Sequence, residues 1–124
     1  NKTTDQVMKL AHLASKCGLD GVVASPQEVG LIRNEIENKR FLIVTPGIRS
    51  PKISKNSKIE QNDDQKRTMT PSEAIRAGSD YLVIGRPILK SKDVVTTVRE
   101  IIHDIQNPPE ETSDAKILEF SKQN

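Results

Sequence analysis

The sequence predicts an α/β protein built on a parallel β-sheet. Three short apolar runs, at residues 20–25, 41–45 and 80–85, alternate with segments whose apolar residues recur at helical spacing. The runs are nearly continuous in apolar residues, which is typical of parallel strands that are covered on both faces. Two architectures fit this order, an open doubly wound sheet and a (β/α)8 barrel. In both of them the functional residues lie at the carboxyl ends of the strands.

The first helix is expected over residues 4–17, ahead of the first strand. Thr3 and Gln6 fit a capping box at its start, and Gly18 is a natural stop at its end. The residues at helical spacing in this segment are Val7, Leu10, Ala11, Ala14 and Cys17.

The next two helices are expected to begin with the same device. It reads "SPQE" at 25–28 and "TPSE" at 70–73: a hydroxyl residue caps, a proline takes the first helical position, and a glutamate closes the capping box. The second of these helices ends at Gly78. A last helix over 94–105 has strong apolar periodicity, and "NPP" at 107–109 stops it.

The composition excludes several classes of function. The chain has 124 residues, of which 29% are charged and 34% hydrophobic, as is typical of a soluble, ordered domain. A net charge of +2 and only three aromatic residues, Phe41, Tyr81 and Phe120, argue against a nucleic-acid partner. No apolar stretch reaches the roughly 18 residues that a membrane-spanning helix needs. The single Cys17 cannot form an internal disulfide, which favours a reducing compartment, and we expect the cytoplasm.

Two arginines follow neighbouring strands of the predicted sheet. Arg49 comes after the second strand in "TPGIR", and Arg86 comes after the third in "GRP". Because consecutive strands are usually neighbours in a sheet, both guanidinium groups are expected above the same rim. Residues 50–67 between them lack apolar periodicity, which is typical of a functional or disordered loop. Since Gly85 also lets the backbone approach a ligand closely, the strand ends predict a phosphate site.

These stretches resemble those of a known family. "GLDGVVASPQE", "VTPGIR", "DDQKR" and "TPSEAIRAGSDYLVIGRPI", in this order and at these spacings, are similar to the C-terminal half of bacterial orotidine 5'-phosphate decarboxylase. The resemblance implies that residues 1–106 are the C-terminal part of a (β/α)8 TIM barrel, with about three parallel strands and flanking helices. Residues 107–124 would then be a polar tail. The family works as a homodimer and converts orotidine 5'-monophosphate (OMP) to UMP and CO2 in pyrimidine biosynthesis, without metal or organic cofactor.

The resemblance also implies roles for individual residues. Four positions would hold the substrate phosphate: Arg49, Gln65, Gly85 and Arg86. Two more would border the pyrimidine pocket: Pro46 and Ile48. Gln65 would come from the loop and bridge the phosphate and the base when this loop closes.

The catalytic residues that the family implies are missing from this sequence. They are alternating Lys and Asp side chains in an Asp-x-Lys-x-x-Asp motif on an earlier strand, and no such motif occurs in the 124 residues. A whole barrel takes roughly 250 residues, so this chain would hold strands six, seven and eight. We therefore expect the chain alone to be inactive. Asp63 and Asp64 lack a His or a third acid beside them, so no metal site is predicted.

Two other functions remain open at this point. One is a non-catalytic phosphate-binding module that kept the fold and lost the reaction. The other is another phosphate-binding barrel enzyme, such as a sugar-phosphate decarboxylase or an enzyme of the indole pathway. The decarboxylase is preferred because every implied phosphate residue is present, whereas a decaying module is expected to lose some. An Asp-x-Lys-x-x-Asp motif upstream of Asn1 would distinguish the decarboxylase from the module.

Overall fold

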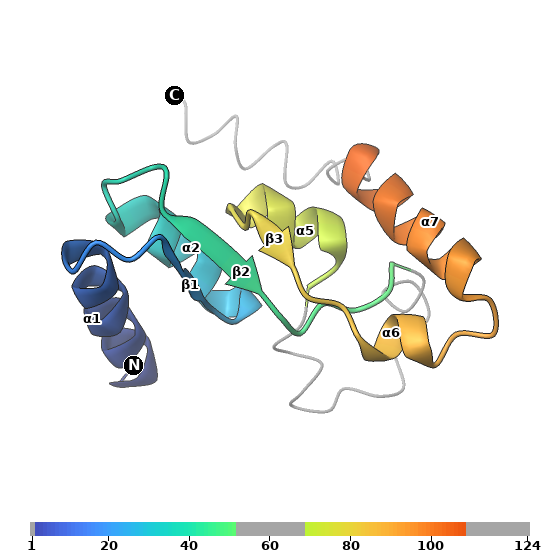
Figure 1. Ribbon diagram of the computed structural model, residues 1–124, viewed down its shortest axis with the longest axis horizontal. Helices are drawn as coiled ribbons and strands as arrows, with labels where there is room; N and C mark the ends of the chain where they lie inside the picture. Colours follow the sequence, from blue (N-terminus) through green and yellow to red (C-terminus); the bar gives the residue numbers. More distant parts are fainter. Residues whose placement is uncertain (1, 52–68, 109–124) are drawn as a thin grey trace, which may run out of the picture.

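The computed structural model describes residues 2–51 and 69–108, which form a three-stranded parallel sheet with helices around it (Figure 1). The strands lie in the order β1–β2–β3, and each neighbouring pair is parallel. In chain order the elements are α1 (Lys2–Lys16), β1 (Gly21–Val23), α2 (Pro26–Glu35), β2 (Leu42–Thr45), α5 (Pro71–Ala77), β3 (Tyr81–Leu82), α6 (Arg86–Leu89) and α7 (Val94–Gln106). The predicted α/β fold with three parallel strands is confirmed. None of the helices in these two segments is long and apolar enough to cross a membrane.

The two hydroxyl–proline motifs behave differently at the starts of α5 and α2. Thr70 caps α5 as predicted, because its hydroxyl accepts a hydrogen bond from the Glu73 N–H at 3.3 Å. The Ser25 side chain makes no such bond at the start of α2, so the predicted side-chain cap is wrong. Its backbone carbonyl instead accepts from the Glu28 N–H at 3.0 Å. The proline at the first position of α2 already fixes a helical φ, so this helix starts without the side-chain cap.

Helix α1 starts earlier than predicted and stops close to the predicted place. It already includes Lys2, so Thr3 lies inside the helix and the capping box expected there is wrong. At the other end, Gly18 adopts a φ of +82°, a conformation that favours glycine. The Leu19 N–H then donates back to the Ala14 carbonyl at 3.0 Å, which satisfies a free carbonyl of the last turn.

The third strand is shorter than expected because the chain turns into a short helix. The apolar run at 80–85 contains only the two-residue strand Tyr81–Leu82. The Val83 N–H still donates to the Thr45 carbonyl of β2 at 2.9 Å, and the chain then leaves the sheet. Helix α6 follows, with Arg86 as its first residue. Four residues are too few to show apolar periodicity, so the sequence did not predict this helix.

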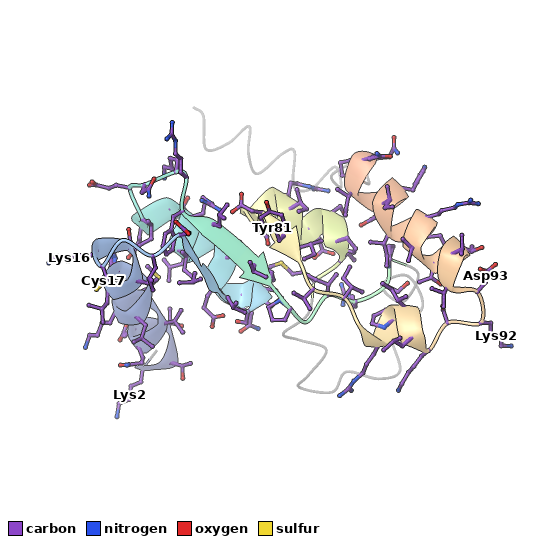
Figure 2. The ribbon with its side chains drawn as sticks, in the orientation of Figure 1. Lys2, Lys16, Cys17, Tyr81, Lys92 and Asp93 are labelled. Carbon is purple, nitrogen blue, oxygen red and sulfur yellow. The ribbon has the colours of Figure 1, made fainter. Side chains whose placement is uncertain are left out.

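Within residues 2–51 and 69–108, helices cover one face of the sheet and leave the other open. Ile43 and Thr45 of β2 point to the covered face and are 0% exposed. Val23 and Tyr81 are 72% and 60% exposed, and both pair in register with Val44, so they share the open face. Tyr81 is labelled on β3 in Figure 2. The core under the covered face consists of Met8, Ala11, Ala24, Val29, Ile32, Ile36, Phe41 and Ile43.

Arg33 of α2 ties together the amino ends of the strands. It donates from Nη1 to the Phe41 carbonyl at 2.7 Å and from Nη2 to the Gly78 carbonyl at 2.8 Å. Nη2 also lies 2.6 Å from Asp80 Oδ2, an oxygen that accepts the Ile43 N–H at 2.8 Å. One guanidinium therefore joins α2, the end of α5 and the starts of β2 and β3. These bonds lie at the amino end of the sheet, away from the predicted site, so Arg33 stabilises the fold.

We expect Arg33→Ala to lower the free energy of unfolding by about 1–3 kcal/mol, because several carbonyls and the Asp80 carboxylate lose a charged donor. Urea denaturation measures this loss. The matched control is Arg40→Ala, since Arg40 is exposed near the same end of β2. Arg40 bonds to Asn38 through its backbone N–H, so alanine keeps this bond. An equal loss from both substitutions would contradict the specific role of Arg33.

Candidate functional site

The chain leaves β2 in a fixed direction. Thr45 is fully buried at the end of the strand, and its hydroxyl lies 2.6 Å from the hydroxyl of Ser79. The Ser79 hydroxyl also contacts the Ile43 carbonyl at 3.2 Å, which anchors the end of β2 to the start of β3. Pro46 is half-buried, and Gly47 has a φ of +74°, which most other residues rarely adopt. The "TPG" stretch therefore turns the chain sharply over the carboxyl end of the sheet.

The next residues run beside the segment that leads into α5. Ile48 forms a parallel bridge with Met69 and is 5% exposed. The Arg49 N–H donates to the Met69 carbonyl at 2.9 Å. This pairing places the Arg49 side chain next to the first turn of α5.

Arg49 has one charged neighbour in the described chain. Its Nη2 lies 3.7 Å from Oε1 of Glu73, and the two side chains are 28% and 46% exposed. Its Nε is buried and has no hydrogen-bond partner among the described residues. A buried N–H without a partner is costly to the fold. The exposed part of the guanidinium remains available to an anion.

Arg86 lies on the neighbouring strand connection. It is exposed, and neither it nor Lys90 takes part in an ion pair recorded within the described ranges. The Lys90 N–H donates to the Arg86 carbonyl at 2.9 Å, so the two residues are one helical turn apart. Gly85, just before Arg86, has open space where a side chain would be. The backbone of Gly85 is thus accessible to a ligand.

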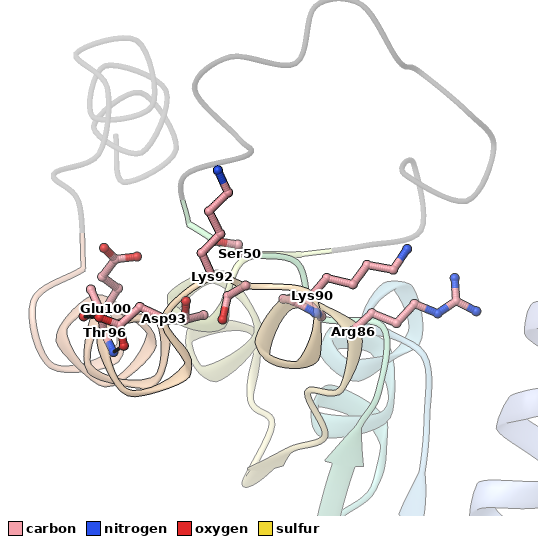
Figure 3. Close-up of a pocket in the computed structure, with 10 residues that line it drawn as sticks. Ser50, Arg86, Lys90, Lys92, Asp93, Thr96 and Glu100 are labelled. Atoms are coloured by element: carbon pink, nitrogen blue, oxygen red, sulfur yellow. Dashed lines mark hydrogen bonds between the residues drawn. The ribbon is translucent and has the colours of Figure 1, made fainter.

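A hollow of about 510 Å³ lies between α6, α7 and the segment after β2 (Figure 3). Ser50, the residue after Arg49, lines it together with Arg86 and Lys90. Arg86 and Lys90 extend in the same direction in Figure 3, whereas Lys92 points elsewhere. On the α7 side, the Thr96 hydroxyl and the Thr96 N–H both donate hydrogen bonds to the Asp93 carboxylate. These bonds, the hydroxyl's first, hold the pKa of this carboxyl below its usual range.

The structure brings together part of the predicted site. The segments after β2 and β3 meet at the hollow, as the parallel sheet predicts, through Ser50 and Arg86. The Arg49 side chain does not line this hollow and instead turns toward Glu73. Gln65 and most of the loop at 50–67 lie outside the described residues.

Glu73, Ser50 and Lys90 were not singled out as site residues from the sequence. The capping motif predicted that Glu73 lies in the first turn of a helix. No sequence signal indicated that this turn lies next to Arg49. Among residues 2–51 and 69–108, no group of three His, Cys, Asp or Glu side chains is placed to hold a metal ion.

Parallel strands with helices between them, and arginines on the connections at their carboxyl ends, fit part of a (β/α)8 barrel. The sequence profile of the orotidine 5'-phosphate decarboxylase / HUMPS family matches residues 1–101. The chain belongs to this family.

Known relatives agree with this membership. The chain is 54% identical over 101 residues to the orotidine 5'-phosphate decarboxylase of Geobacter sp. (strain M21), and 55% identical over 101 residues to that of Geotalea uraniireducens. These alignments cover 82% of this chain and 39% of each relative. A crystal structure of orotidine 5'-phosphate decarboxylase from Lactobacillus acidophilus superposes with a TM-score of 0.64 at 33% identity, over 83% of this chain and 38% of that one. The chain therefore spans about two fifths of the length of the relatives it matches.

Proposed function

We propose that this chain forms the phosphate-binding part of an orotidine 5'-phosphate decarboxylase, which converts OMP to UMP and CO2. The observation that carries the proposal is the meeting of the segments after β2 and β3 at one hollow, with Arg86 and Ser50 in its lining. These are the connections on which the family resemblance places the phosphate. Relatives with this name share 54–55% identity with the chain.

The phosphate would be held by Arg49, Gln65, Arg86 and the backbone of Gly85. Guanidinium groups bind phosphate oxygens through two parallel charge-assisted hydrogen bonds. The partly exposed side chain of Arg49 and the open space beside Gly85 support this assignment. Pro46 and Ile48 would border the pyrimidine, and the burial of Ile48 suits a wall that packs behind the ring.

The phosphate does not react, so this part of the enzyme would act through binding energy. That energy can offset the cost of ordering the substrate and of removing water from the reacting carboxylate. The Lys and Asp side chains that destabilise the carboxylate and protonate the product carbon would come from an earlier part of the barrel. The whole enzyme would be a cytoplasmic homodimer that needs no metal or organic cofactor.

A chimera tests this proposal. In the chimera, residues 1–101 replace the matching segment of the Geobacter sp. relative, and the rest of that barrel stays. We expect it to fold and to decarboxylate OMP, because the graft would restore every implied phosphate contact. A folded chimera that binds UMP without turnover would instead support the non-catalytic phosphate-binding module, and one that neither binds nor turns over would refute both.

We expect Gln65→Ala in the chimera to raise KM for OMP about tenfold, because one hydrogen bond to a charged group is lost. The effect on kcat should be smaller, which is the sign of lost binding in ground and transition states alike. Steady-state kinetics give both constants. Gln61→Ala in the same segment is the matched control, and an equal rise in KM from that change would argue against a specific role for Gln65.

A further inference from the structure

Glu73 makes two contacts with a single carboxylate oxygen. Its Oε1 accepts a hydrogen bond from the Thr70 hydroxyl at 2.8 Å and lies 3.7 Å from Nη2 of Arg49. The Thr70 hydroxyl in turn accepts the Glu73 N–H, so the carboxylate is held by the cap of α5. Its position therefore does not depend on Arg49.

Arg49 is fixed at its other end. Its N–H bonds to the Met69 carbonyl at 2.9 Å, just before the residue that caps α5. The backbone bond therefore places the base of the Arg49 side chain beside α5. The Glu73 carboxylate then attracts the guanidinium to a defined position. Five N–H groups surround a guanidinium, and a neighbour near Nη2 leaves most of them for another acceptor. Nε is buried, so the N–H groups that remain available are those on the exposed part of the guanidinium.

From this geometry we infer that Glu73 is a positioning residue for the substrate phosphate. It holds Arg49 so that the exposed part of the guanidinium faces the anion. The first turn of α5 fixes the position of Glu73 and therefore that of the guanidinium. The inference rests on the proposed function, and it adds a residue that does not itself touch the substrate.

A carboxylate near a phosphate also repels the phosphate and competes with it for the arginine, which is the opposite effect. Two distances favour positioning. At 3.7 Å the Glu73 oxygen is too far from Nη2 for a good hydrogen bond, so it attracts the guanidinium without occupying the donor. The same oxygen already has a donor in Thr70 at 2.8 Å. The two roles predict opposite signs for the change in substrate affinity.

The test is Glu73→Gln in the chimera. Glutamine keeps the length of the side chain and an oxygen for the Thr70 hydroxyl, and it removes the charge that attracts Arg49. We expect KM for OMP to rise about two- to fivefold, the range for losing a partly exposed ion pair. We expect a smaller change in kcat and an unchanged melting temperature. Glu35→Gln is the matched control, because Glu35 is 47% exposed and pairs with His12 at 3.4 Å at another place in the fold. It should leave KM unchanged.

A double-mutant cycle with Arg49→Ala shows whether Glu73 acts through Arg49. We expect Glu73→Gln to have no further effect on KM once Arg49 is alanine. An equal rise in both backgrounds, or a KM that stays the same or falls after Glu73→Gln, overturns the positioning role. If Arg49→Ala raises KM in those cases, the proposed phosphate site still stands. If Arg49→Ala changes nothing, both the inference and the phosphate role of Arg49 are wrong.

Discussion

Arg86→Ala in the chimera should weaken transition-state stabilisation by about 2–4 kcal/mol, measured as the fall in kcat/KM for OMP. The reason is that Arg86 is exposed at the carboxyl end of the sheet, on the first turn of α6. No ion pair holds it within the described ranges, so its removal should cost the fold little. The loss should therefore fall on ligand binding.

Three further measurements separate this role from a general effect of charge. Arg40→Ala removes one positive charge near the opposite end of the sheet and should leave kcat/KM unchanged. Arg86→Lys keeps the charge but loses the planar pair of donors, so it should recover only part of the activity. Uridine, which lacks the phosphate, should bind equally well to the parent chimera and to the Arg86→Ala variant. A fall in kcat/KM of less than about threefold would count against Arg86 as a phosphate ligand.

Local signals in the sequence predicted the elements that depend on neighbouring residues. The "TPSE" motif correctly gave the start of α5, because a hydroxyl, a proline and a glutamate act within one helical turn. The three apolar runs correctly gave parallel strands, because their lengths and their alternation with helices leave few other arrangements. Helix α6 was missed, since its four residues have no periodicity to read.

Contacts between distant residues could not be predicted in the same way. Arg33 bonds to the Gly78 carbonyl across 45 positions of the chain, and nothing in the spacing indicates this. The pairing of Arg49 with Glu73 depends on the bridge between Ile48 and Met69, which forms only when the chain is folded. The rule for parallel sheets predicted which strand connections meet, but it did not predict how each side chain is aimed.

The 124-residue chain on its own should associate with itself, or need the rest of the barrel, to fold stably, and it should not decarboxylate OMP. In the order β1–β2–β3, the two outer strands each have one edge without a partner in the described chain. Such edges pair readily with other chains. The open face of the sheet also exposes Val23 and Tyr81, which a closed barrel would place in its interior. Helix α1 adds two exposed leucines, Leu10 at 55% and Leu13 at 57%.

Size-exclusion chromatography with light scattering and a decarboxylation assay test both parts of this prediction. Self-association should weaken when the rest of the barrel is present, because the earlier strands would pair with the free edges and cover the open face. The chimera is therefore the matched control, and we expect it to be a dimer that forms no larger assemblies and has measurable turnover. Activity should be absent from the short chain because no Asp-x-Lys-x-x-Asp motif occurs in its sequence. A stable monomer would contradict the need for the rest of the barrel, and turnover by the short chain would mean that the catalytic residues lie among these 124.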